Sequence, residues 1–205
     1  MKQTLKIFTT LLLLNITFSN SYSQQNTSGW YWINSQPQGN EIRWVQIIDA
    51  THYYAVGKKG TFMKSTDAGD TWLINSQAGN PEPFFGSGGT LNLSTGWFFD
   101  ANTGFVGGSN SDSTGNSYIQ RTTDGGETFT RIPLNNGYGN ALIRDIYFLN
   151  ANTGYICGNQ SLKLMKTTNG GLNWTNVPNL PVDPFSFKSI YALDENNVFL
   201  GTDIN

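Results

Sequence analysis

The sequence predicts an all-β fold of four-stranded antiparallel blades arranged as a β-propeller. The first observation behind this prediction is a segment of two short apolar strands that recurs at intervals of roughly 45 residues. The second is composition, because 23 glycines and 14% aromatic residues in a chain of 205 suit short strands joined by tight turns. The third is that no stretch beyond the N-terminal apolar segment shows the period of a helix.

The repeated segment consists of an apolar strand, a polar turn and a second apolar strand that ends in glycine. Its four copies occupy residues 42–57, 93–108, 143–158 and 187–201. The turns at 100–104 and 150–154 read D-A-N-T-G and N-A-N-T-G, and Asn, Asp and Gly supply the backbone angles that such turns need. We therefore expect a first strand such as Ile42–Ile48, followed by a second strand that ends at the glycine.

A second motif follows the first three copies and matches the Asp-box pattern S/T-x-D-x-G-x-T-W/F. A hydroxyl and a carboxylate can bond backbone groups across the turn, and the glycine permits a positive φ. The predicted structural residues are Ser65, Asp67, Gly69, Thr71 and Trp72, then Thr122, Asp124, Gly126, Thr128 and Phe129, then Thr167, Asn169, Gly171 and Trp174. Asn169 replaces the carboxylate in the third box, but its amide oxygen can accept the same bonds. A third strand is expected to run into each box, and a fourth, such as Trp72–Asn75, to begin at its aromatic residue.

The N-terminus has the order of a secretory signal peptide. Lys2 and Lys6 precede a short apolar stretch, and small residues flank Tyr22 at the expected cleavage site after Ser23. The apolar stretch is shorter than the about 20 residues that a membrane span needs. Residues 1–23 are therefore expected to be removed on export, which leaves a mature chain without a transmembrane segment.

Residues 24–205 are expected to form a partial propeller. Segment Trp32–Gln36 resembles the fourth strand of the following repeat, which predicts an outer strand at 30–36. Blades are expected at about 42–77, 93–134 and 143–178, with half a blade at 187–205. Because the half blade lacks a third strand and a box, we expect the protein to continue beyond residue 205 into a propeller of about 6–8 blades. A four-bladed ring with one defective blade is the alternative.

The opening Trp32–Gln36, the D-A-N-T-G turns and the spacing of the boxes resemble the BNR/Asp-box repeat β-propellers of the photosystem II stability/assembly factor family. The resemblance covers about Trp30 to the end of the chain, and bacterial secreted members are more similar to it than the plastid proteins. It implies a propeller and export. It does not imply photosystem assembly, because one fold serves many functions.

Asp-boxes also occur in sialidases and some endoglucanases, so an enzyme is the rival hypothesis. Arg131-Ile132-Pro133 matches a sialidase motif, but it follows the second box on an outer strand, whereas the sialidase motif precedes the first box. His52 is the only histidine, and no His/Cys/Asp cluster has the spacing of a metal site. The sequence thus assigns no catalytic residue, cofactor or metal. The rival is a sialidase-like or other glycoside hydrolase whose remaining catalytic residues lie beyond residue 205.

Candidate ligand-binding residues lie on the face opposite the boxes, where the loops between blades vary in length. Arg43, Arg144 and Lys188 occupy one equivalent position near the start of the first strand, which Ser94 fills in the second copy. Converging cations would favour a carboxylate, a phosphate or an acidic peptide, and solvated charges at strand ends are the alternative. The loops add three aromatic candidates, Phe84, Phe85 and Tyr138. Such aromatics either anchor a partner or pack on their own blades.

The sequence therefore predicts a non-catalytic recognition or scaffold propeller that binds a protein or glycan partner, with an acidic ligand as one option. The net charge of −2 argues against non-specific nucleic-acid binding, which needs a basic surface. The predicted location is outside the cytoplasm: secreted, periplasmic or at the cell surface.

Overall fold

The computed structural model describes residues 39–75, 78, 91–110, 117–132, 134, 142–159, 162–180 and 186–202. The predicted signal peptide, the predicted outer strand at 30–36 and the aromatic candidates Phe84, Phe85 and Tyr138 lie outside these residues. Within them, no helix has the length and apolar character needed to cross a membrane.

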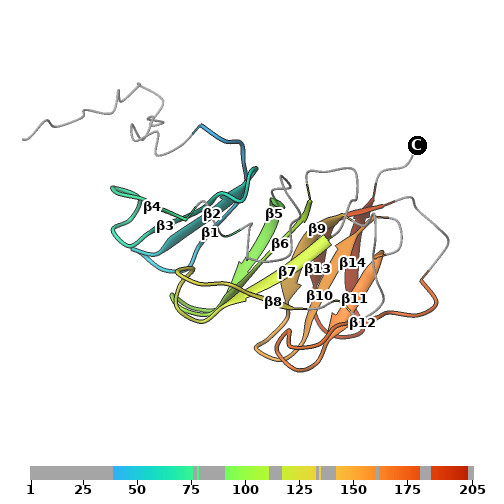
Figure 1. The fold of residues 1–205 in the computed structure, drawn as a ribbon. Helices are drawn as coiled ribbons and strands as arrows, with labels where there is room; N and C mark the ends of the chain where they lie inside the picture. Colours follow the sequence, from blue (N-terminus) through green and yellow to red (C-terminus); the bar gives the residue numbers. More distant parts are fainter. Residues whose placement is uncertain are drawn as a thin grey trace, which may run out of the picture. The chain divides into compact units, whose positions relative to one another are not determined.

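The described residues form three four-stranded antiparallel sheets and one two-stranded sheet (Figure 1). The first sheet contains β1 (Ile42–Ile47), β2 (Tyr53–Gly57), β3 (Phe62–Ser65) and β4 (Leu73–Asn75). The second contains β5 (Leu91–Phe98), β6 (Gly104–Asn110), β7 (Ser117–Thr122) and β8 (Thr130–Ile132). The third contains β9 (Ile143–Phe148), β10 (Gly154–Gly158), β11 (Leu164–Thr167) and β12 (Thr175–Asn176), and the fourth contains β13 (Phe187–Ala192) and β14 (Val198–Thr202). In each sheet the strands are neighbours in chain order, so the three four-stranded sheets are meanders and the fourth is a hairpin.

The fourth strand of each four-stranded sheet begins one residue later than the sequence predicts, because the aromatic residue of the box belongs to the turn. In the third sheet the indole Nε1 of Trp174 donates a hydrogen bond of 3.0 Å to the carbonyl oxygen of Gly171, within the turn itself. Strand β12 therefore starts at Thr175. The second strand of the second sheet also differs, since β6 continues past Gly108 to Asn110, where Ser109 pairs with Ser117 of β7.

The core lies between successive sheets, in three clusters of buried apolar side chains. The first and second sheets enclose one cluster around Tyr54, Phe62 and Phe98. The second and third sheets enclose the largest, and the third and fourth enclose the last. The first strands of neighbouring sheets are in contact, β1 with β5, β5 with β9 and β9 with β13. This stacking of sheets side by side, with the first strands in series, is the blade arrangement of a propeller.

Each first strand contains a β-bulge at the same position of the repeat. The ladder to the second strand skips one residue in every sheet, namely Arg43, Ser94, Arg144 and Lys188. A bulge leaves one residue without a partner across the ladder and turns its side chain in a new direction.

The bulge explains the glycine at the end of the second strand. A Cβ atom on Gly57, Gly108 or Gly158 would lie 2.0, 2.1 or 2.2 Å from a backbone carbonyl oxygen at the start of the first strand. No side chain fits at that separation, so in these three sheets the bulge and its facing glycine form one structural unit, whereas Thr202 takes the facing position in the fourth sheet.

Candidate functional site

The first two box turns share one pattern of hydrogen bonds. The hydroxyl of Ser65 donates to Asp67 Oδ1 over 2.8 Å and accepts from the N–H of Gly69 over 2.8 Å. Asp67 Oδ1 also accepts from the N–H of Thr71 over 2.8 Å, and Asp67 Oδ2 accepts from the Thr71 hydroxyl. The equivalent bonds of the second turn join Thr122, Asp124, Gly126 and Thr128.

The third turn keeps most of this pattern without a carboxylate. Asn169 Oδ1 accepts from the Thr167 hydroxyl and from the N–H of Asn173, both over 3.0 Å. The N–H of Gly171 donates to the Thr167 hydroxyl over 3.0 Å. The hydroxyl-to-carboxylate bond of the other turns has no counterpart here, because Asn173 has no hydroxyl and Asn169 has an amide nitrogen in place of the second carboxylate oxygen. The amide oxygen is therefore sufficient to hold the backbone of this turn.

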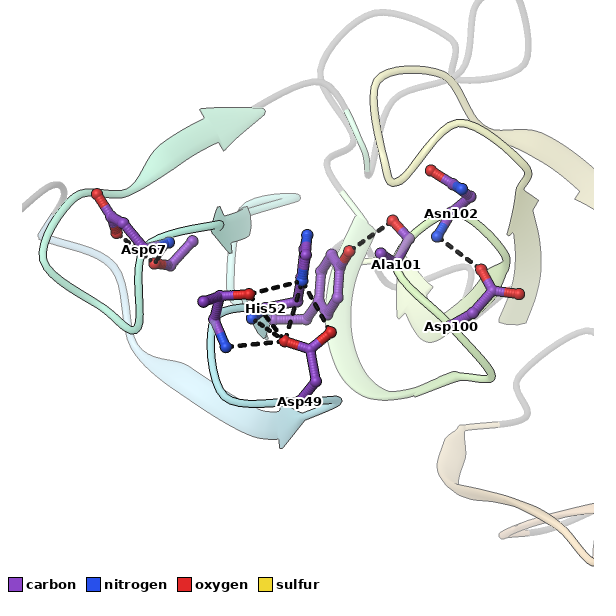
Figure 2. A network of polar contacts seen from close by, with 9 residues as sticks. Asp49, His52, Asp67, Asp100, Ala101 and Asn102 are labelled. Carbon is purple, nitrogen blue, oxygen red and sulfur yellow. Dashed lines mark hydrogen bonds and ion pairs between the residues drawn. The ribbon is translucent and has the colours of Figure 1, made fainter.

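The turns between first and second strands lie beside the boxes and are closed in a similar way (Figure 2). Asp49 Oδ1 accepts from the N–H groups of Thr51 and His52, both over 2.8 Å. Equivalent acceptors in the other sheets are Asp100, Asn150 and Asp194. The hydroxyl of Tyr54 donates over 2.7 Å to the carbonyl oxygen of Ala101, so the turn of the second sheet is bonded to the first sheet.

These hydrogen bonds keep the turn carboxylates ionised. The Thr71 hydroxyl and N–H lower the pKa of Asp67, and the N–H groups of Thr51 and His52 lower that of Asp49. For Asp124, burial acts to raise the pKa, but the bonds from Thr128 prevail and lower it to about 2. An acid whose pKa lies this low cannot donate a proton near neutrality, so these carboxylates stabilise turns and do not act as general acids.

We expect Asp124→Ala to reduce the free energy of unfolding by about 1 kcal/mol, as for the loss of a helix-capping side chain. Asp124→Asn should have a smaller effect, because Asn169 already holds the third turn with an amide oxygen. The advantage of Asp124 over asparagine should be present above its ordinary pKa of 3.8 and vanish as pH falls toward its folded value of about 2. Urea unfolding of the unaltered protein, Asp124→Ala and Asp124→Asn at several pH values measures these differences in the free energy of unfolding. Equal stability of the two variants would contradict the prediction.

Three further observations on the described residues concern groups that catalysis commonly uses. No group of three or more His, Cys, Asp or Glu side chains there is placed to hold a metal ion. Cys157 is buried, and its burial together with the charge of Asp145 raises the pKa of the thiol to about 12. Arg131 of the sialidase-like tripeptide lies on β8, the last strand of its sheet, with its guanidinium carbon 3.5 Å from the centroid of the Tyr118 ring.

The bulge residues lie at the opposite end of the strands from the boxes. The side-chain hydroxyl of Ser94 donates over 2.6 Å to the carbonyl oxygen of Ile143, directly before the next bulge residue, Arg144. Equivalent positions of successive sheets are therefore close together. Arg43 Nε lies 3.0 Å from Glu41 Oε1, Arg144 is half-buried and Lys188 is exposed. We call the end of the strands that carries these bulge residues the bulge end.

Further cations at the bulge end are missed by the sequence analysis. Lys58 and Lys59 follow Gly57 in the turn between β2 and β3, and Lys58 Nζ lies 2.5 Å from Glu41 Oε2. The N–H of Lys59 donates over 3.1 Å to Asn92 Oδ1 of the next sheet. The signal available was their position directly after the strand-ending glycine, which the repeat places beside the bulge.

Three four-stranded antiparallel meanders in series, closed by these turns and followed by a two-stranded sheet, define a BNR-like β-propeller. The family model described as "Photosynthesis system II assembly factor YCF48" matches residues 90–205, more than half of the chain. The chain belongs to this YCF48 family. No curated protein matches it. The predicted family and the predicted propeller of four-stranded antiparallel blades are both confirmed.

Several solved structures are similar in fold, and three of them are described here. The structure titled "YCF48 bound to D1 peptide" has 22% identity and a TM-score of 0.50, and the match covers 68% of this chain and 41% of that one. YCF48 from Cyanidioschyzon merolae has 19% identity and a TM-score of 0.51, with 77% and 49% covered. The GH74 xyloglucanase from Xanthomonas campestris has 14% identity and a TM-score of 0.58, with 88% and 28% covered. The chain thus spans less than half the length of each, and the likeness at these identities is one of fold.

Proposed function

We propose that this protein is a non-catalytic recognition propeller that binds an acidic segment of a protein partner at the bulge end. The observation that carries the proposal is the bulge itself, which occurs in four successive first strands and carries a cation in three of them. A bulge turns its side chain away from the ladder, and side chains at equivalent positions of adjacent strands can act on one ligand.

The balance of charge supports an acidic partner. Among the described residues, the cations at the bulge end are Arg43, Lys58, Lys59, Arg144, Lys163 and Lys188. The described acids there are Glu41 and Asp145, and Asp145 points between sheets. Its Oδ1 lies 3.2 Å from the Thr95 hydroxyl and its Oδ2 accepts from the N–H of Ile190 over 3.0 Å.

The form of the partner follows from the described strand ends. The bulge residues lie at the ends of successive first strands, and a short extended acidic segment can contact several of them at once.

The comparisons support a peptide as the partner class. A protein of the YCF48 family has been solved with a bound D1 peptide. The rival function is that of a glycoside hydrolase, and its only support is the similarity of fold to GH74 enzymes. The glycan partner that the sequence also allows depends on the same similarity. Export, which the predicted signal peptide implies, would place the recognition propeller outside the cytoplasm.

The test is binding of a glutamate-rich synthetic peptide to the double variant Arg43→Ala/Arg144→Ala, measured by fluorescence anisotropy at low salt. We expect affinity to fall at least tenfold, which corresponds to about 1.4 kcal/mol, and added salt to weaken the unaltered protein further. Lys64→Ala/Lys166→Ala is the matched control, because it removes two cations at the box end. Equal affinity of the two double variants would refute the proposal.

A further inference from the structure

The third box turn contains Asn169 followed by Gly170, a pair in which asparagine readily loses its side-chain amide. The reason is that glycine has no side chain to hinder attack of its backbone nitrogen on Cγ of the preceding residue. Asn136-Gly137 is the other such pair in the sequence, and it lies outside the described residues. Asn169 is exposed, so water and hydroxide can reach it. The residue that replaces the aspartate of the other boxes is therefore a candidate for covalent change.

The folded turn restrains both groups that would react. The N–H of Gly170 donates over 2.9 Å to the carbonyl oxygen of Asn152, in the turn between β9 and β10. The backbone of Asn152 is itself fixed, because its N–H donates over 2.9 Å to Asn150 Oδ1. Asn169 Oδ1 accepts two hydrogen bonds of 3.0 Å within the box turn. The Gly170 nitrogen can therefore attack only after its bond to Asn152 opens.

We propose that Asn169 is a site of spontaneous deamidation whose rate is set by opening of the bond between the Gly170 N–H and the Asn152 carbonyl. In the reaction the Gly170 nitrogen forms a bond to Asn169 Cγ, and the side-chain amide leaves as ammonia with the proton of the Gly170 N–H. Water then opens the resulting succinimide at either of its carbonyl carbons. The product is aspartate or isoaspartate, and in isoaspartate the main chain runs through Cβ and Cγ. The reaction consumes water, releases ammonia and involves no oxidation.

The first two boxes hold the same backbone bond without the reactive amide. The N–H that follows the aspartate donates to the neighbouring turn over 3.0 Å in the first sheet and 2.8 Å in the second. The bonds from Thr71 lower the pKa of Asp67, and burial raises the pKa of Asp124 but the bonds from Thr128 prevail. An ionised carboxylate is a poor target for a nucleophile. Among the described boxes, the third is therefore the one that can react.

The isoaspartate product is expected to weaken the interface between the second and third sheets. Its longer main chain no longer places a side-chain acceptor to close the turn. Gly171 of this turn lies so close to the second sheet that a Cβ atom on it would be 2.5 Å from the Phe105 ring. The carbonyl oxygen of Gly171 also accepts from Trp174 Nε1 over 3.0 Å. Deamidation should therefore lower the free energy of unfolding as the protein ages.

Peptide mapping by mass spectrometry, during incubation in mildly alkaline buffer, tests the proposal. Trypsin cleaves after Arg144 and Lys166, so Asn136 and Asn169 fall in different peptides. The folded protein should convert slowly at Asn169, and in urea, where the turn is open, conversion should be faster by about tenfold or more.

Two variants test whether the neighbouring turn controls the rate. Asn150→Ala removes the acceptor that fixes the Asn152 backbone, so conversion in the folded protein should rise about fivefold. Asp100→Ala is the matched control, because Asp100 closes the equivalent turn of the second sheet with two bonds of 2.7 Å. It should leave the rate at Asn169 unchanged. Circular dichroism checks that both variants fold.

Gly170→Ala tests the chemistry itself and should suppress conversion both in the folded protein and in urea. The substitution suits the turn, because Ala68 takes this position in the first box with a φ of 63°, against 67° for Gly170. Equal rates at Asn169 in the folded protein and in urea would overturn the proposal. So would a folded protein that keeps Asn169 intact throughout, or equal rates for Asn150→Ala and Asp100→Ala.

Discussion

Replacing Trp174 with alanine is expected to lower the free energy of unfolding by about 3–5 kcal/mol. The indole is 1% exposed and belongs to the cluster that joins the second and third sheets. Its ring meets Phe148 edge to face with centroids 5.7 Å apart, and its Nε1 donates to the carbonyl of Gly171. The substitution removes the packing and the hydrogen bond together, and a cavity remains between two sheets. Equilibrium unfolding in guanidinium chloride measures the loss.

Two further variants separate the contributions of this side chain. Trp72 occupies the same position of the first box but is only half-buried, so Trp72→Ala should reduce stability less. Trp174→Phe should fall between the unaltered protein and Trp174→Ala, because Phe129 fills this position in the second box and packs edge to face on Phe62 with centroids 5.2 Å apart. Equal losses for Trp72→Ala and Trp174→Ala would show that burial between sheets is not what makes this residue important.

Replacing Gly158 with alanine is expected to reduce the free energy of unfolding by about 3 kcal/mol, the upper end of the usual effect of overpacking. The new methyl carbon would lie 2.2 Å from the carbonyl oxygen of Leu142 and 2.9 Å from Leu162 Cδ2. The carbonyl belongs to the backbone that leads into the bulge, so it cannot move without opening the ladder between β9 and β10. The change should therefore destabilise the third sheet as a whole.

Gly201 provides a control in the fourth sheet, where it pairs with Ser189 across the ladder and so corresponds to Cys157, one residue before the position of Gly158. A methyl group there would meet the Ser189 hydroxyl at 2.4 Å, and a serine side chain can rotate away. Gly201→Ala should therefore leave stability nearly unchanged, whereas Gly158→Ala should shift the denaturant midpoint strongly. If both variants were equally tolerated, the bulge would not require glycine opposite it.

Much of the fold follows from the sequence because the repeat is local. The alternation of apolar residues, the turn residues and the strand-ending glycine place each first and second strand within about two residues of its observed limits. The start of the fourth strand is predicted one residue early, because periodicity does not show that Trp174 bonds within its own turn. The apolar periodicity also does not predict the bulges, although the four bulge residues occupy equivalent positions of the repeat.

The links between sheets could not be predicted from the sequence, since they join residues about 50 positions apart. Gln46 reads as a surface residue, yet its side chain bonds both the N–H and the carbonyl of Phe98, over 2.8 and 3.0 Å. Asp145 reads as a solvated charge beside Arg144, yet it bonds the N–H of Ile190 in the next sheet. Burial raises the pKa of Asp145, as expected for a carboxylate that packing between sheets removes from solvent.

The bulge gives each repeat a position where the side chain differs. In three sheets a glycine stands opposite, and the bulge residue is arginine in two of them and serine in the third; in the fourth sheet Thr202 stands opposite and the bulge residue is lysine. A substitution there alters what the protein displays, and at Ser94 it would also remove the hydrogen bond to the carbonyl oxygen of Ile143 in the next sheet. Divergence after duplication can thus adjust recognition one repeat at a time, while the residues that preserve the architecture stay under separate constraint.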